Sequence, residues 1–189
     1  MTDLKSRLDR IRPRVTSTEF LTGSGLGNEV PFYAFDYPPT DEPQVAGHIE
    51  WLVADITRRT SLRIANVNVL ALALQVLKDR GLYDKAIAME LAKGVPALLG
   101  ALKGPLEPGK LAKTLMTQAC SEPVDMVFLT GVGAAYPLVR THSLLNNLQP
   151  LLGRVPLVLF FPGRFNGQAL QLFGELQETP YYRAFRLVD

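Results

Sequence analysis

The glycine-rich segments are the first place in this chain to look for a ligand site. Gly104, Gly109 and Lys110 have the spacing of a phosphate-binding loop, in which a Ser or Thr follows the lysine. Here Leu111 occupies the hydroxyl position, Glu107 adds negative charge, and two prolines remove backbone N–H donors. The segment also follows a helical pattern rather than a strand, so it does not predict nucleotide binding.

A second glycine pair follows a predicted strand. Thr130, Gly131 and Gly133 come after the apolar run 124–129, at the carboxyl end of a strand, where open α/β sheets bind ligands. With Asp36, which ends another predicted strand, they form a candidate pocket for a nucleotide or a metal ion. The alternatives are a tight strand-to-helix turn for the glycines and a turn cap for Asp36. The pattern favours these alternatives over a pocket.

The other reactive side chains form no catalytic or metal-binding pattern. The two histidines, His48 and His142, fall on separate predicted helices, and no Gly-x-Ser-x-Gly sequence places a serine nucleophile beside either. The single cysteine, Cys120, excludes an intramolecular disulfide and a cysteine-ligated metal site. We therefore predict no catalytic residue, no metal site and no cofactor.

Two clusters of polar and aromatic residues are typical of recognition surfaces. Asn and Gln disfavour helix interiors, so their amides are available to bind backbone or a partner, and aromatic residues with Arg often anchor protein interfaces. The candidate interface residues are Arg140, Asn146, Asn147, Gln149, Phe161, Arg164 and Phe165. The alternative for the cluster from Arg140 to Gln149 is a buried polar network. The alternative for the cluster from Phe161 to Phe165 is a loop whose aromatic rings face inward.

The N-terminal residues predict a short amphipathic helix over 1–14. Leu4, Leu8 and Ile11 follow helical spacing and give the helix one apolar stripe, and Pro13 is expected to end it. This stripe packs either on its own domain or, as a candidate interface, on a partner.

Apolar runs separated by helical patterns predict the fold that positions these residues. Strands are expected at 30–37, 62–68, 124–130, 155–161 and 184–188, and helices between them and at 168–177. Because the strand runs are apolar on both faces, we predict a single α/β domain over residues 1–189, with three layers and a mainly parallel sheet covered by helices. The helix-rich residues 82–120 are expected to form an insertion or a cap.

Composition limits the class of protein further. The chain has 189 residues, 47% of them apolar, and a formal net charge of +2, which excludes a disordered protein. Positive residues are scattered, and residues 19–55 contain seven acids and no Lys or Arg, which argues against direct DNA binding. With neither a secretory signal pattern nor an apolar run long enough to cross a bilayer, we expect a cytoplasmic protein without a membrane partner.

Five strings of residues resemble the BrxB family of BREX phage-defence systems. They span residues 20–33, 127–133, 142–152, 161–163 and 181–187, and include FLTGSGLGNEVPFY and HSLLNNLQPLL. Because these strings are ordered and spread over nearly the whole chain, the resemblance is far more specific than any glycine motif above.

The resemblance implies a small cytoplasmic bacterial component, encoded with an adenine methyltransferase, an AAA-type ATPase and the alkaline-phosphatase-like protein PglZ. It carries no catalytic residue over to this chain. It implies a non-enzymatic assembly subunit that binds PglZ and other BREX subunits, and a homodimer is the expected state of the chain itself. The alternative is a degenerate nucleotide- or metal-binding α/β domain with ligand-dependent regulatory activity.

Overall fold

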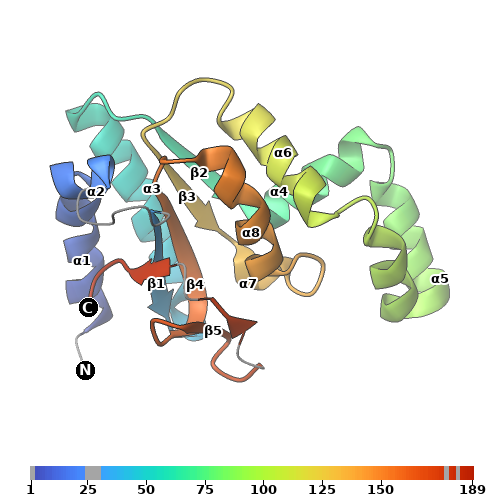
Figure 1. Cartoon of the computed structure of the whole chain (residues 1–189). Helices are drawn as coiled ribbons and strands as arrows, with labels where there is room; N and C mark the ends of the chain where they lie inside the picture. The colour runs from blue at the N-terminus through green and yellow to red at the C-terminus, as the bar shows by residue number, and fades with distance from the viewer. Residues whose placement is uncertain (1–2, 24–30, 177–178, 182–183) are drawn as a thin grey trace.

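A parallel β-sheet forms the centre of the molecule. In the computed structural model, which describes residues 3–23, 31–176, 179–181 and 184–189, the parallel strands lie in the order β2, β3, β4, β1 and β7 (Figure 1). These strands are Ile64–Asn68, Met126–Thr130, Leu157–Phe165, Phe32–Tyr37 and Ala184–Arg186. The predicted α/β class and the mainly parallel sheet are confirmed.

Each central strand contributes side chains to two separate cores. In β1, Tyr33, Phe35 and Tyr37 are buried in one core, and Phe32 and Ala34 are buried in the other. This division follows from strand geometry, which points successive side chains to opposite faces of the sheet. Both faces need apolar side chains, which explains why the strand segments are continuous apolar runs in the sequence.

Helices α1 (Leu4–Val15), α2 (Thr18–Thr22) and α3 (Glu42–Arg59) cover one face of the sheet (Figure 1). The amphipathic pattern of α3 directs its buried residues to this core. Helix α1 runs past Pro13, its predicted end, because Val15 is fully buried and holds the last turn against the sheet.

Helices α4 (Val69–Asp79), α6 (Pro108–Ala119), α7 (Val132–Ala135) and α8 (Thr141–Leu152) cover the opposite face. Helix α6 packs against α8 and β2. Its side chains Leu111, Ala112 and Leu115 are buried in this core. The sheet and its two helical layers confirm the predicted three-layer arrangement.

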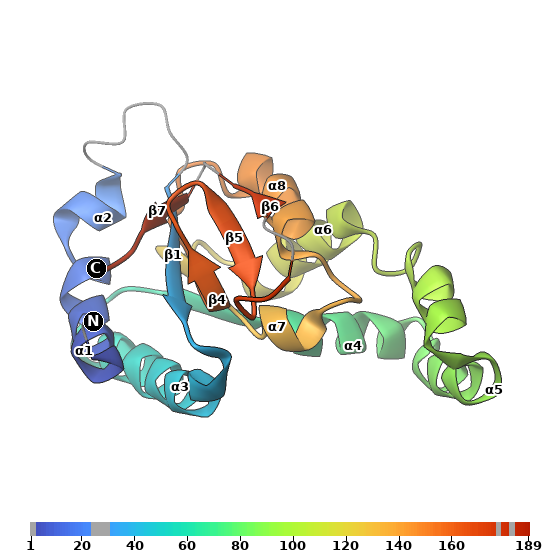
Figure 2. The same cartoon turned by 90° about the horizontal axis from the view of Figure 1, so that it is seen from below.

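Helix α5 (Tyr83–Leu102) projects away from the layers (Figure 2). It is bent at Gly94, whose φ of 76° and ψ of 174° are not helical. Of its residues, Leu102 is buried and the others are half-buried or exposed. The predicted helical insertion at 82–120 therefore divides into a projecting α5 and an α6 that belongs to the helical layer.

The predicted helix at 168–177 is wrong. Strand β5 (Ala169–Leu172) pairs antiparallel with the end of β4, and β6 (Thr179–Pro180) pairs with β5. Gly163 permits this pairing, because a Cβ atom there would lie 2.9 Å from the Phe161 ring and 3.0 Å from the Phe173 nitrogen. The long-range pairing overrides the local helical pattern.

Part of the sequence analysis falls on residues that the structure does not describe. The glycine-rich residues 24–29, the predicted strand start at Val30, and residues 182–183 of the last BrxB-like string lie outside the described residues. Among the helices that are described, none has both the length and the apolar composition needed to cross a membrane.

Candidate functional site

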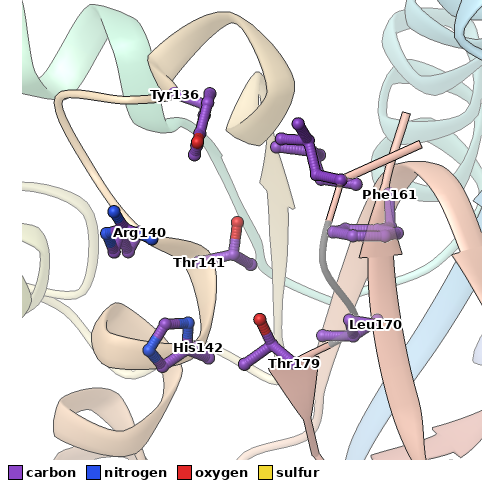
Figure 3. A pocket seen from close by; sticks show the side chains of 9 residues that line it. Tyr136, Arg140, Thr141, His142, Phe161, Leu170 and Thr179 are labelled. Carbon is purple, nitrogen blue, oxygen red and sulfur yellow. The ribbon is translucent and has the colours of Figure 1, made fainter. Parts of the chain in front are cut away.

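A cavity of about 380 Å³ opens beside the carboxyl end of β4 (Figure 3). Its walls come from the connection between α7 and α8, from β4, and from the C-terminal strands β5 and β6. The lining residues are Tyr136, Arg140, Thr141, His142, Phe161, Leu170, Leu172, Leu176 and Thr179. This position agrees with the general placement of ligand sites in parallel α/β sheets.

The polar side of the cavity is built where helix α8 begins. Strand β3 ends at Thr130, Gly131 turns the chain with a φ of 68°, and the short α7 leads to Arg140 at the N-cap of α8. Three consecutive residues, Arg140, Thr141 and His142, therefore reach the cavity from one wall (Figure 3).

The apolar side of the cavity is built by two paired strands. Phe161 comes from β4, and Leu170 and Leu172 come from β5, where period-2 alternation directs both leucines to the same face. The α7–α8 side of the cavity thus carries the cation and a hydroxyl together with the Tyr136 ring, and the strand side is mainly aromatic and aliphatic, with the Thr179 hydroxyl at its edge (Figure 3).

Two of the polar groups differ in charge. The Arg140 side chain is exposed, and its guanidinium lies 6.0 Å from the centre of the Tyr136 ring. His142 is half-buried, and burial followed by the nearby Arg140 charge lowers its pKa below the usual 6.5. The imidazole is therefore neutral at pH 7, which leaves Arg140 as the cation of the cavity lining.

The candidate pocket residues Thr130, Gly131 and Gly133 are not among the residues that line the cavity. A Cβ atom on Gly131 would lie 2.7 Å from Asn68 Cγ, and one on Gly133 would lie 2.7 Å from Pro162 Cγ. The Thr130 hydroxyl donates a hydrogen bond to the Val67 carbonyl at 3.3 Å. Neighbouring side chains fill the space, so these residues make the tight strand-to-helix turn that was the alternative.

Asp36 is neither a pocket residue nor a turn cap. Its Oδ1 accepts hydrogen bonds from Arg7 Nη2 and Arg186 Nη1, both at 2.9 Å, and its Oδ2 accepts one from the Phe165 amide at 2.9 Å. The carboxylate is thereby engaged in a structural ion-pair network joining α1, β1, β4 and β7. The arginines lie 29 and 150 residues away in sequence, so no local pattern indicates them.

The N-terminal stripe is not an interface. Leu8 and Ile11 are buried in the core between α1, α3 and the sheet, and Leu4 is half-buried against the same core. The interface prediction is wrong for these residues, and the alternative, packing on the chain's own domain, is what the structure shows.

The aromatic cluster after β4 is also directed inward. Phe161 and Phe165 are each 2% exposed, whereas Arg164 between them in the pairing with β5 is exposed. Buried rings cannot anchor a partner, so these two phenylalanines are corrected to core residues, and Phe161 also forms a wall of the cavity.

The amide cluster on α8 is mixed in its exposure. Asn146 is exposed, and Asn147 and Gln149 are half-buried. The Asn147 side chain donates a hydrogen bond to the Ser143 carbonyl at 2.8 Å, within its own helix. Of the predicted interface residues, Arg140, Asn146 and Arg164 are therefore the exposed ones.

The sequence analysis located only part of the cavity. Arg140 and Phe161 were candidates, but for an interface and not for a cavity. Leu170 and Leu172 were missed because residues 168–177 were predicted to be a helix, and Thr179 was missed because β6 is fixed only by its pairing with β5. The alternation of leucines at 170 and 172 is the signal that favours a strand there.

Comparison with known proteins decides the family. A family model described as BREX protein BrxB matches residues 65–187, which is most of the chain. The chain belongs to the BrxB family. A BrxB protein from Bacillus cereus (strain H3081.97) is 40% identical over 192 residues and covers 100% of both chains. Another from Escherichia coli O9:H4 (strain HS) is 37% identical over 185 residues, 98% of this chain and 92% of its own length.

The BrxB resemblance seen in the sequence is confirmed, and the chain is a subunit of a BREX system. No solved structure gives a significant match to it. In the part of the chain that the structure describes, no group of three or more His, Cys, Asp and Glu side chains could hold a metal ion.

Proposed function

We propose that this BrxB protein is a non-enzymatic assembly subunit that holds the PglZ-like protein, and through it other subunits, in the BREX complex. We propose that it acts in the cytoplasm. The observation that supports the proposal is the projecting helix α5, which carries large apolar side chains into solvent.

The exposed apolar residues of α5 form the proposed docking arm. Leu91 is 85% exposed, and Ile87 and Val95 are 45% and 49% exposed. Ile87 and Leu91 lie four residues apart and share one helix face, and Val95 follows the bend at Gly94. Large apolar side chains gathered in solvent mark interaction sites on proteins. Helix α6, which packs within its own domain, buries large apolar side chains such as Leu111.

Retention of the partner by a tagged chain tests this proposal. Leu91→Glu places a charge at the centre of the arm, and the high exposure of Leu91 means that the change has little effect on folding. We expect co-purification of the PglZ-like protein to fall at least tenfold, with an unchanged melting temperature. Leu151→Glu is the matched control, because Leu151 is a 40%-exposed leucine on α8.

Equal retention by the wild type and Leu91→Glu would contradict the proposed arm. Charge reversal at the exposed Arg164 tests the alternative surface beside β5. Light scattering on the purified chain tests the expected homodimer, and a dimer that Leu91→Glu converts to a monomer would assign the arm to self-association instead of to the partner.

A further inference from the structure

The cavity beside α8 has a chemical polarity that the proposed assembly role does not use. The cation Arg140 and the Thr141 hydroxyl lie on one side, and mainly aromatic and aliphatic side chains lie on the other (Figure 3). We infer that it binds a small molecule that joins one phosphate group to a flat, partly apolar body, the chemical class of the nucleoside monophosphates.

The phosphate end is assigned to Arg140 and the start of α8. Among the residues that the structure describes, no carboxylate lies within ion-pair distance of Arg140, and no Asp or Glu lines the cavity. The Thr141 hydroxyl faces the same space (Figure 3). Arg140 lies at the N-cap of the twelve-residue α8, and its side chain makes no capping bond there. The backbone amides of the first helical turn therefore add their partial positive charge to the charge of Arg140. A guanidinium, a hydroxyl and these amides are suitable ligands for a phosphate.

The body of the ligand is assigned to the opposite wall. Phe161 and Leu170 line this wall but are almost fully buried. The half-buried Leu172 and Leu176 therefore offer the apolar surface against which a planar ring can pack. The Thr179 hydroxyl points into the cavity from the strand side, and Tyr136 lines it on the same side as Arg140 (Figure 3). Several separated hydroxyls suit a ligand that carries its own hydroxyl and ring-nitrogen groups, such as a nucleoside, better than they suit a fatty acid.

The size of the cavity agrees with this class. Its volume of about 380 Å³ lies within the roughly 300–1,000 Å³ of most small-molecule sites. It accommodates one nucleotide and not a polynucleotide. His142, which is neutral at pH 7 because burial lowers its pKa, contributes a hydrogen bond rather than a second charge.

This site is separate from the docking arm. No residue of α5 lines the cavity, so a variant of either site leaves the other intact. The inference therefore stands or fails independently of the proposed assembly function.

Calorimetric titration of the full chain tests the inference. The probe is AMP, with adenosine and inorganic phosphate as partial ligands and with GMP, CMP and UMP as base variants. We expect saturable binding of at least one of the four monophosphates with one site per chain. Adenosine and phosphate alone are expected to bind at least tenfold more weakly, because each contacts only one wall.

Variants of the exposed Arg140 assign the binding to the cavity. Arg140→Ala is expected to weaken monophosphate binding at least tenfold, and Arg140→Lys is expected to restore part of it through the retained charge. Arg154→Ala, at an exposed arginine beyond the other end of α8, is the matched control and is expected to bind like the wild type. Thermal unfolding checks that the variants are folded.

Three outcomes would overturn the inference. One is the absence of saturable binding by all four monophosphates at millimolar concentration. Another is equal weakening by Arg140→Ala and Arg154→Ala, which would indicate only non-specific attraction between charges. The third is adenosine or phosphate binding as tightly as AMP, which would show that the two walls do not act on one ligand.

Discussion

At the scale of single residues, Asp36 connects parts of the chain that are far apart in sequence. It receives hydrogen bonds from Arg7, Arg186 and the Phe165 amide. Asp36→Asn removes the charge and one acceptor, so we expect the free energy of unfolding to fall by about 2–3 kcal/mol. Urea denaturation measures this change. Glu50→Gln, at an exposed carboxylate on α3, is the control and should change stability by less than about 0.5 kcal/mol.

Asp55 makes stability depend on acid pH. Hydrogen bonds from Arg59 and then Arg58 lower the pKa of this carboxyl below its usual 3.8, and the charge of Arg12 acts in the same direction. A carboxyl whose pKa is depressed by folding stabilises the protein above its unfolded pKa, and this contribution is lost as the pH falls through the folded value. The wild type should therefore be more stable than Asp55→Asn at pH 7.

Denaturation of the wild type and Asp55→Asn at a series of pH values measures the effect. The difference in unfolding free energy is expected to be constant at neutral pH and to shrink as the pH falls below about 4, near the usual Asp pKa. A difference that stays constant or grows on acidification would show that the ion pairs with Arg12, Arg58 and Arg59 do not favour the charged form of Asp55.

At the scale of elements, the turn from β3 to α7 is coupled to the start of α4. Gly131 has a φ of 68° and lies against the Asn68 side chain, which caps α4 by accepting a hydrogen bond from the Ala71 amide at 3.0 Å. Gly131→Ala strains the backbone and displaces this cap, so we expect a loss of about 2 kcal/mol in the free energy of unfolding. Gly47→Ala is the control substitution for this effect.

Gly47→Ala distinguishes this effect from the loss of any glycine. Gly47 lies within α3, and a Cβ atom there would meet no atom within 4 Å. The substitution is expected to stabilise the protein by about 0.5–1 kcal/mol, because alanine is the better helix former. Equal effects of Gly131→Ala and Gly47→Ala on the melting temperature would contradict the coupling of the turn to the cap.

The elements also show how far the sequence predicts the structure. Strands with a continuous apolar run, such as β3 and β4, were found because both of their faces are buried. The helix predicted at 168–177 failed because β5 is fixed by pairing with the end of β4, and local spacing carries no information on that contact. The cavity wall depends on the same pairing, which is why sequence reasoning reached Arg140 and Phe161 but not Leu170.

At the scale of the whole molecule, the chain separates a stable body from a projecting arm. Two apolar cores enclose the sheet, one under α1 to α3 and the other under α4, α6, α7 and α8. Helix α5 contributes little to either core (Figure 2). A packed body that presents an apolar arm is suited to joining other proteins. The candidate nucleotide or metal pocket at Gly131 and Gly133 is instead a turn, in which neighbouring side chains lie against the glycines.

Amide hydrogen exchange of the chain, alone and with the PglZ-like protein, tests the assembly account most directly. Helix α5 has few buried side chains, so its amides are expected to exchange faster than those of α3 or α6 in the free chain. In the complex, exchange over Tyr83–Leu102 is expected to slow at least tenfold. Unchanged exchange across α5 in a complex that forms would contradict the account.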